Sequence, residues 1–282
     1  MTDAAATLPA RPTIGVFDSG FGGLTVLRAL LHRLPAARFA FLGDTARLPY
    51  GSKSRRTIAR YAAQSARFLV EQQGAEYLVI ACNTASALAL DAIQQAVPVP
   101  VLGVIDPGAL AANAASRTGD VLVIATDATV QSHAYSAACR ARGLRALEQA
   151  CPLLVPLVEE GWTDHPVTAQ VIRIYLDQLN AAAAAAGLTP DTLLLGCTHY
   201  PLLRPLLERS VPPGMRVIDS AEAAAEAAAT LINGRATQEI GTPGTPTAIR
   251  CFATDSVEKF QRLGSRFLGR PVGPVELIDL GG

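Results

Sequence analysis

The chain has few charged residues and no excess of either sign. Charged side chains make up 17% of its 282 residues, and 24 Lys and Arg balance 24 Asp and Glu. The longest basic run is Arg55-Arg56. Proteins that bind DNA or RNA need clustered positive charge. We therefore expect no nucleic-acid partner.

Long apolar runs are also missing, although half of the residues are hydrophobic. No stretch approaches the roughly 18 consecutive apolar residues of a membrane span. Residues 1–11 lack the basic start and apolar core of a secretory signal. We expect a globular protein of the cytoplasm, without a membrane partner, that folds as one large α/β domain or two of ordinary size.

Lysine is scarce, and no cysteines are paired in a C-x-x-C motif. A pyridoxal enzyme needs a lysine for its Schiff base, but Lys53 lies in a predicted polar turn and Lys259 in a predicted amphipathic helix. The five cysteines fit reduced thiols better than a disulfide framework. We expect neither a cofactor nor a metal.

Two of the cysteines follow buried strands. Tyr77–Ala81 leads into Cys82, and the leucines 193–195 with Gly196 lead into Cys197. Ligands of open α/β sheets bind at the carboxyl ends of strands, so both thiols lie where chemistry is expected. The other three are predicted to be small hydrophobic residues inside regular elements: Cys139, Cys151 and Cys251.

A glycine-rich turn joins the first predicted strand to the first helix. Residues 13–17 form the strand, 18–23 the turn and 24–34 the helix. This geometry directs backbone N–H groups at an anion, and a small carboxylate suits it better than a nucleotide. The alternative is a tight turn whose glycines need positive φ.

The rest of the chain alternates strands and helices, which predicts the α/β class. Further strands are expected at 38–42, 99–105, 120–124, 215–218, 248–253 and 275–278, and helices at 55–73, 83–96, 129–139, 166–186, 202–210, 221–233 and 256–268. A Thr/Pro/Gly loop is expected at 241–247.

The strand at 120–124 and its polar end repeat the pattern of the first strand. Each half then runs to a cysteine at a strand end, which suggests an internal duplication with two lobes around a shared cleft. Chance similarity of two βα units is the alternative. Residues after about 213 could extend the second lobe or return to the first.

Three chemistries can use these residues. A Cys197–His199 nucleophile leaves Cys82 unused, and a zinc site lacks paired ligand spacing. Proton transfer at a carbon next to a carboxylate uses both cysteines, one as thiolate and one as thiol. Helix N-termini would lower their pKa values, and Asp18 and His199 would orient them or relay protons.

The chain carries an ordered set of short motifs that resembles the set found in glutamate racemases, members of the cofactor-independent aspartate/glutamate racemase superfamily. The resemblance runs from about residue 14 to 280 and rests on Asp18–Leu24, Gly43–Arg47, Pro49–Gly51, Ala81–Ser86, Pro156–Glu159, Gly196–Pro201, 218–221 and 258–269.

The resemblance implies two pseudo-symmetric α/β lobes, each a mostly parallel sheet flanked by helices, with the active site between them. The first lobe would comprise residues 12–103 and 214–282, and the second 104–213. Cys82 would act on the D-glutamate face and Cys197 on the L-glutamate face. The implied substrate contacts are Asp18, Ser19, Tyr50, Gly51, Asn83, Thr84, Thr198 and His199. Thr126 and Thr129 would line the carboxylate pocket, and Glu159 would lie near the second cysteine.

The implied activity is racemisation of L-glutamate to D-glutamate for peptidoglycan, by a homodimer. Two departures from the family pattern, Asp106 and Ile124–Thr126, are expected beside the bases. Alternatives are a sister racemase or isomerase acting on aspartate, hydantoin or maleate, and a non-catalytic carboxylate-binding protein. A regulatory interaction such as gyrase inhibition has no signal in the sequence.

Overall fold

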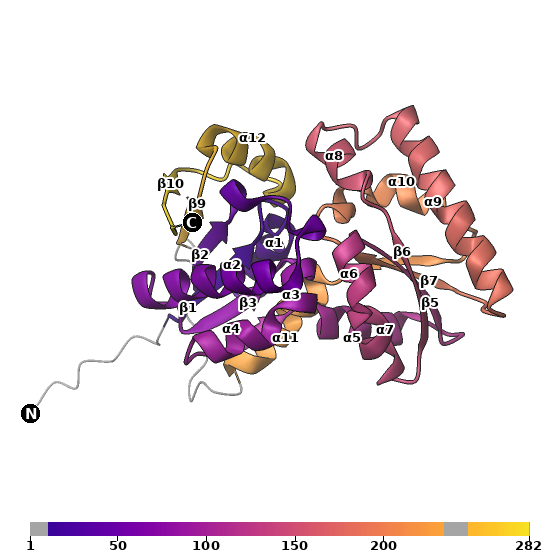
Figure 1. Ribbon diagram of the computed structural model, residues 1–282, viewed down its shortest axis with the longest axis horizontal. Coiled ribbons are helices and arrows are strands. Elements are labelled where there is room, and N and C mark those ends of the chain that lie inside the picture. Colours follow the sequence, from indigo (N-terminus) through magenta and orange to yellow (C-terminus); the bar gives the residue numbers. More distant parts are fainter. Residues whose placement is uncertain (1–10, 234–247, 282) are drawn as a thin grey trace, which may run out of the picture.

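Two parallel β-sheets flanked by helices form two lobes in the computed structural model, which describes residues 11–233 and 248–281 (Figure 1). The first sheet has the order β10-β9-β2-β1-β3-β4. Its strands are β1 (Thr13–Asp18), β2 (Arg38–Gly43), β3 (Tyr77–Ile80), β4 (Val101–Gly103), β9 (Ile249–Ala253) and β10 (Val275–Leu277).

The second sheet repeats the order of the first. It runs β6-β5-β7-β8, just as β2-β1-β3-β4 runs in the first sheet. Its strands are β5 (Asp120–Ala125), β6 (Arg145–Ala150), β7 (Thr192–Gly196) and β8 (Arg216–Asp219). The predicted α/β class with two lobes is therefore confirmed, and the shared strand order supports the suggested duplication.

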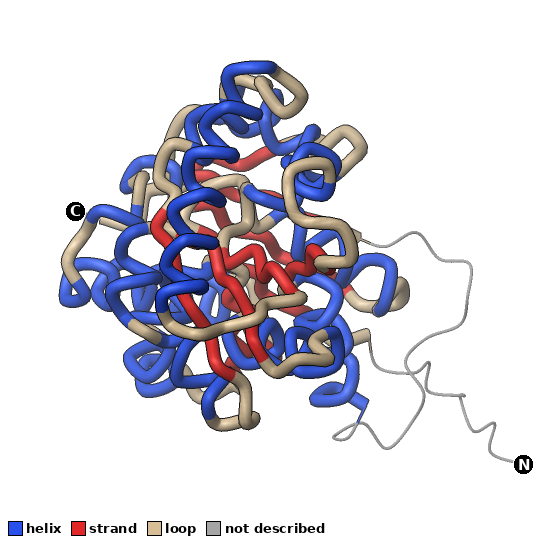
Figure 2. The backbone as a smooth tube through the Cα atoms, turned by 90° about the vertical axis from the view of Figure 1, so that its right-hand side faces the viewer, coloured by secondary structure: helices blue, strands red, loops and turns tan. Residues whose placement is uncertain are grey.

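Helices cover both faces of the sheets, which buries the strands between them (Figure 2). All residues of β5 and β7 are buried, as expected for parallel strands covered on two sides. Helices of the first half are α1 (Leu24–Arg33), α2 (Arg55–Arg67), α3 (Asn83–Leu88), α4 (Leu90–Ala96) and α5 (Ile105–Ala115). Those of the second half are α6 (Asp127–Ser132), α7 (Ala134–Arg140), α8 (Leu154–Glu159), α9 (Pro166–Ala185), α10 (Arg204–Glu208), α11 (Ala221–Asn233) and α12 (Val257–Leu268).

Short turns of other helix types complete the chain. Three are 3₁₀ turns and one is a π-helical turn that continues α2: η1 (Thr45–Arg47), η2 (Tyr50–Ser52), η4 (Tyr200–Leu203) and η3 (Phe68–Gln72). None of the described helices is long and apolar enough to cross a membrane.

The C-terminal segment returns to the first lobe. Strand β9 pairs with β2 and β10 pairs with β9, so the yellow end of the chain lies beside the indigo start (Figure 1). Strand β8, however, pairs with β7 of the second sheet. The division after residue 213 stays a prediction, and the pairing of β8 favours a later boundary, after Asp219.

Several local predictions differ from the structure. The residues expected to end a strand, Asp106–Gly108, form the first turn of α5, where a proline is tolerated because its missing N–H needs no partner. His133, at φ 55°, separates α6 from α7 within one predicted helix. Strand β6 was not predicted, since polar Glu148 and Gln149 hide its pattern. The loop expected at 241–247 lies outside the described residues.

Asp191 anchors the start of β7, the strand that precedes Cys197. Its carboxylate accepts hydrogen bonds from Ser116 Oγ at 2.7 Å and from the backbone N–H of Arg117 at 2.7 Å. Burial alone would raise the pKa of Asp191, but these donors outweigh burial and lower the pKa to about 2.

Replacing Asp191 with Ala is expected to lower the free energy of unfolding at neutral pH by about 1 to 2 kcal/mol, because several hydrogen-bond donors lose a charged acceptor. The folded-state pKa lies below the unfolded value, so this contribution is complete above about pH 4 and disappears as the pH falls towards the folded-state pKa. Urea unfolding of both proteins across that range measures it. An equal difference at every pH would contradict the assignment.

Candidate active site

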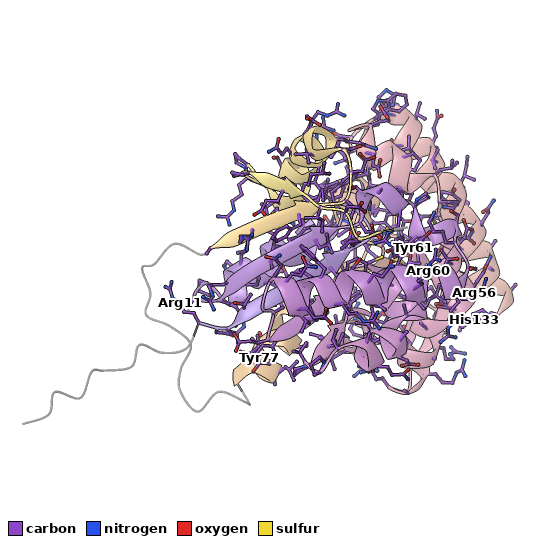
Figure 3. All side chains as sticks on the ribbon, turned by 60° about the vertical axis from the view of Figure 1, so that its left-hand side comes forward. Arg11, Arg56, Arg60, Tyr61, Tyr77 and His133 are labelled. Carbon is purple, nitrogen blue, oxygen red and sulfur yellow. The ribbon has the colours of Figure 1, made fainter. Side chains whose placement is uncertain are left out.

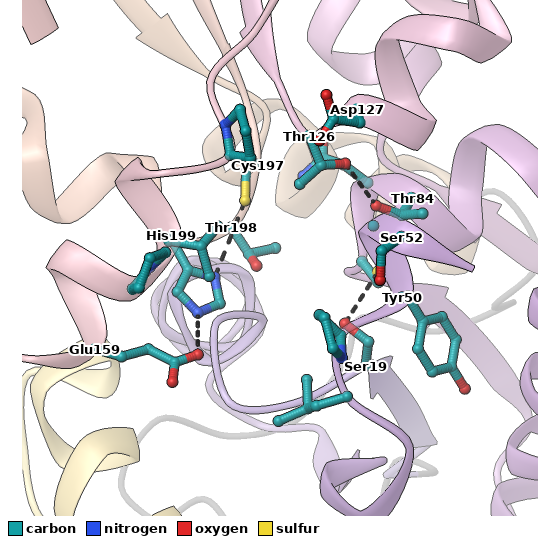
Figure 4. Close-up of a pocket in the computed structure, with 18 of the residues that line it drawn as sticks. Ser19, Tyr50, Ser52, Thr84, Thr126, Asp127, Glu159, Cys197, Thr198 and His199 are labelled. Atoms are coloured by element: carbon teal, nitrogen blue, oxygen red, sulfur yellow. Dashed lines mark hydrogen bonds and ion pairs between the residues drawn. The ribbon is translucent and has the colours of Figure 1, made fainter. Parts of the chain in front are cut away.

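A cavity of about 360 Å³ lies between the carboxyl ends of the two sheets (Figure 4). β1 has β2 on one side and β3 on the other, and β5 is placed likewise between β6 and β7. Each sheet thus presents its topological switch point to the cavity. Most residues named from the sequence line its wall: Ser19, Tyr50, Gly51, Cys82, Asn83, Thr84, Thr126, Glu159, Cys197, Thr198 and His199.

Cys82 follows β3 and forms the N-cap of α3. The backbone N–H of Ala85 donates to its Sγ at 3.4 Å, and the thiol donates to Ser19 Oγ, also at 3.4 Å. We expected the helix N-terminus to lower the pKa of this thiol. That expectation is wrong, because burial and the nearby charge of Asp18 raise the pKa of Cys82 to about 12, despite both hydrogen bonds.

Cys197 follows β7 and faces a basic partner. Its Sγ lies 4.0 Å from Nδ1 of His199, and Nε2 of the same ring lies 3.3 Å from Oε1 of Glu159 (Figure 4). Burial alone would lower the pKa of His199, but hydrogen bonds to Cys197 and Glu159 and their charges raise it to about 10. The imidazole is therefore protonated at neutral pH.

Asp18 lies behind the wall, not on it. Its side chain is 1% exposed and accepts a hydrogen bond from the backbone N–H of Gly20 at 2.9 Å. Burial raises its pKa above the ordinary value. Asp18 was predicted to contact substrate directly, but in this structure it influences the cavity through its electrostatic effect on Cys82 and His199.

The turn after β1 needs glycine for close approach and not for backbone angle. Gly20, Gly22 and Gly23 all have negative φ. A Cβ at Gly22 would come within 2.3 Å of Thr198 Oγ1 and 2.6 Å of His199 Nδ1. The first lobe therefore touches the His199 loop of the second at a point where only glycine fits.

Tyr50 lines the cavity, but its hydroxyl group points elsewhere. The hydroxyl donates to Asp44 Oδ2 at 2.5 Å, and Figure 4 shows the ring directed away from the other labelled side chains. The ring packs against Phe17 and Tyr61, the latter labelled in Figure 3. At this point of the wall, the groups available to a ligand are therefore the backbone of Tyr50 and the neighbouring Gly51.

A group of threonine hydroxyls joins the lobes beside the cavity. Thr84 of α3 lies 3.0 Å from Thr126 and 3.2 Å from Thr129, oxygen to oxygen, and the last two are 2.9 Å apart. Thr84 and Thr126 line the cavity, whereas Thr129 is fully buried behind them. The expectation that Thr129 lines the pocket is therefore wrong.

Asn83 is held from the second lobe. The buried hydroxyl of Tyr135 on α7 donates to Asn83 Oδ1 at 2.5 Å. Asn83 directly follows Cys82, so this bond connects the start of α3 to the opposite lobe. With Oδ1 occupied, the amide NH₂ is the group left for other partners.

Sequence reasoning missed two charged residues on the wall, Asp127 and Lys259. Lys259 lies on the predicted amphipathic helix, now α12, yet its ammonium group is 3.3 Å from Glu159 Oε2. Conversely, Asp106 was expected beside the bases, but its side chain is 77% exposed and pairs with Arg142. Only tertiary contacts could reveal either fact.

The remaining cysteines are buried in apolar clusters, as predicted. Within residues 11–233 and 248–281, no three His, Cys, Asp or Glu side chains come together in a way that could hold a metal ion.

Comparison with known proteins assigns the family. Residues 14–228 match the model of the Asp/Glu/Hydantoin racemase family. The chain belongs to this family. Among curated members, it is 54% identical to the glutamate racemase of Koribacter versatilis over 96% of this chain and 99% of that one.

Solved structures of the Asp/Glu/hydantoin racemase family agree in fold. The glutamate racemase isoform RacE1 of Bacillus anthracis superimposes with a TM-score of 0.85 at 35% identity, covering 95% of this chain and 98% of that one. The Francisella tularensis glutamate racemase, solved in complex with D-glutamate, gives 0.84 at 34% identity, covering 96% and 98%.

Replacing Tyr135 with Phe removes only the hydroxyl that fixes Asn83. We expect the free energy of unfolding to fall by about 1 to 3 kcal/mol, because a buried carbonyl oxygen loses its donor. Thermal or urea unfolding of the wild type and the variant gives this value. The Tyr135 hydroxyl also bonds Ser220, so the double variant Tyr135→Phe, Asn83→Ala should lose clearly less than the sum of the two single losses. Fully additive losses would contradict the pairing.

Proposed function

We propose that this protein is a cofactor-independent glutamate racemase. The observation that carries the proposal is a single cavity with one cysteine from each lobe at its wall. The relatives reported above are named glutamate racemases, and one of them was solved with D-glutamate bound. Two thiols in one cavity suit a reaction that removes a proton from one face of a carbon and returns one to the other.

In the direction from L- to D-glutamate, the thiolate of Cys197 takes the Cα proton. The thiol of Cys82 then donates its proton to the opposite face. The reaction leaves Cys82 as thiolate and Cys197 as thiol, which is the form that accepts D-glutamate. Proton exchange with solvent or the reverse reaction restores the first form.

The electrostatics favour one resting form. The raised pKa of Cys82 keeps it a neutral thiol, and the imidazolium of His199 stabilises a thiolate at Cys197. These surroundings suit the proposed form that accepts L-glutamate, in which Cys82 is the thiol. When Cys82 becomes a thiolate, the N–H of Ala85 and the hydroxyl of Ser19 are placed to stabilise it.

The other wall residues bind the substrate. Hydroxyl and amide groups suit the two carboxylates and the ammonium group of glutamate. These contacts are assigned to Ser19, Asn83, Thr84, Thr126, Thr198 and His199, with the backbone at Tyr50 and Gly51. Asp18 and Glu159 act through Cys82 and His199. In the cell, a cytoplasmic homodimer of this kind would supply D-glutamate for peptidoglycan.

Replacing either Cys82 or Cys197 with Ala should lower the racemisation rate by at least about 10²- to 10⁴-fold, because a proton-transfer group is lost. Circular dichroism of L-glutamate in D₂O, without cofactor, follows the rate, and NMR follows deuterium at Cα. Cys82→Ala should confine any residual exchange to L-glutamate, and Cys197→Ala to D-glutamate. Cys139→Ala, which removes a buried thiol outside the cavity, serves as control.

Near wild-type rates in either variant would refute the two-base assignment. Aspartate in the same assay tests the substrate, because the sister enzymes of the superfamily act on it. Faster racemisation of aspartate than of glutamate would reassign the protein to that activity, and no reaction with either would leave carboxylate binding as the better explanation.

Replacing Glu159 with Gln should shift the alkaline limb of kcat/KM to lower pH. Glu159 raises the pKa of His199, and above that pKa the imidazolium is lost, which leaves the thiolate charge uncompensated beside an anionic substrate. Profiles of kcat/KM from neutral to alkaline pH for both proteins measure the shift. A shift to higher pH would contradict the assignment.

A further inference from the structure

A chain of polar contacts runs along the wall of the cavity from one lobe to the other. It starts at Lys259 on α12 of the first lobe, whose Nζ lies 3.3 Å from Oε2 of Glu159. The second oxygen of Glu159 lies 3.3 Å from His199, which in turn faces Cys197. The chain thus ends on one thiol and not on the other.

Lys259 is unusual among the residues of the wall. Among the described residues that line the cavity, His199 is the only other basic side chain, and the acidic ones are Asp127 and Glu159. A cavity proposed to take a dicarboxylate therefore carries two carboxylates on its own wall, and the Lys259 ammonium group offsets the charge of Glu159.

Helix α12 also holds the histidine by packing. The ring of Phe267 meets the His199 ring edge-on, with centroids 5.0 Å apart. The Lys259 ammonium lies 5.6 Å from the centroid of Phe21, whose ring also contacts His199. This helix lies beyond residues 14–228, the part of the chain that the family model matches. The C-terminal return thus supplies contacts to His199 from outside the segment that the family model matches.

We propose that Lys259 is a positioning residue, which holds Glu159 against His199 and thereby supports the thiolate of Cys197 alone. Glu159 ends α8, and its side chain is 20% exposed, so water can compete for its oxygens. With the ammonium group bound to Oε2, the carboxylate is kept with Oε1 towards the imidazole. The proposal rests on the proposed function for its kinetic consequences only.

The one-sided effect has a defined kinetic signature. Enantiomers have equal free energy in water, so kcat/KM must be the same in both directions for every variant. Weaker support of the Cys197 thiolate depopulates the form that accepts L-glutamate. KM for L-glutamate then rises relative to KM for D-glutamate, and the two kcat values change in the same ratio. A variant that only loosened the fold would change KM and kcat for L- and D-glutamate by the same factors, so their ratios would stay at the wild-type values.

The kinetic test compares Lys259→Met, Lys259→Arg and Arg262→Met. Arg262 is an exposed cationic residue of the same helix outside the cavity wall, so its variant is a matched control for lost charge. We expect the ratio of KM for L- to D-glutamate to rise about twofold to fivefold in Lys259→Met, the range of a partly exposed ion pair. Lys259→Arg and Arg262→Met should keep the wild-type ratio.

A second measurement needs no substrate. Iodoacetamide alkylates thiolates, and peptide mass spectrometry gives the rate at Cys197 relative to Cys82 in the same sample. This ratio should fall about twofold to fivefold in Lys259→Met. If the wild-type protein does not racemise glutamate but the alkylation ratio still falls in Lys259→Met, the proposed function is wrong and the positioning role stands.

A double-mutant cycle separates positioning from a direct effect of charge. In a Glu159→Gln background, Lys259→Met should leave the alkylation ratio unchanged, because Lys259 acts through Glu159. A further fall in that background would overturn the proposal, because it would mean that the Lys259 charge acts on Cys197 directly and not through Glu159. An unchanged ratio in Lys259→Met alone would overturn it as well.

Discussion

The site depends on two thiols from different sheets being held at one small cavity. Each sheet can place a cysteine at the end of a strand, but neither sheet controls the distance to the other. That distance depends on contacts between lobes at the start of α3, where Thr84 meets Thr126 at 3.0 Å and Asn83 accepts from Tyr135 at 2.5 Å. The residues that follow Cys82 therefore bind the lobe that carries Cys197.

The close approach of the lobes is also steric. Gly22 lies so near the side chains of Thr198 and His199 that any Cβ would displace them. Protein interiors are packed densely enough that a displacement of one side chain moves its neighbours. Catalysis by proton transfer is sensitive to such displacements, because the donor and acceptor must stay within hydrogen-bonding reach of the reacting carbon.

Similar lobes provide dissimilar surroundings for the two thiols. Cys82 lies near a buried carboxylate, Asp18, which opposes its ionisation. Cys197 lies near an imidazolium that is stabilised by Glu159. The proposed two-base reaction needs one thiol and one thiolate when substrate arrives, and the unlike surroundings of the two cysteines suit that requirement. Strand order is thus duplicated, while the electrostatics are not.

The sequence by itself determined the α/β class, the alternation of elements, and both strand-end cysteines. These features depend on local periodicity and on glycine turns, which neighbouring residues specify. The burial of Cys139, Cys151 and Cys251 followed from the same patterns.

Only the tertiary structure decided that β8 joins the second sheet, that Asp18 lies behind the wall, and that Lys259 reaches Glu159 across 100 residues of sequence. It also decided the raised pKa of Cys82, which we expected to be lowered. Burial and long-range charge control these properties, and both depend on which distant segments pack together, which local sequence patterns do not encode.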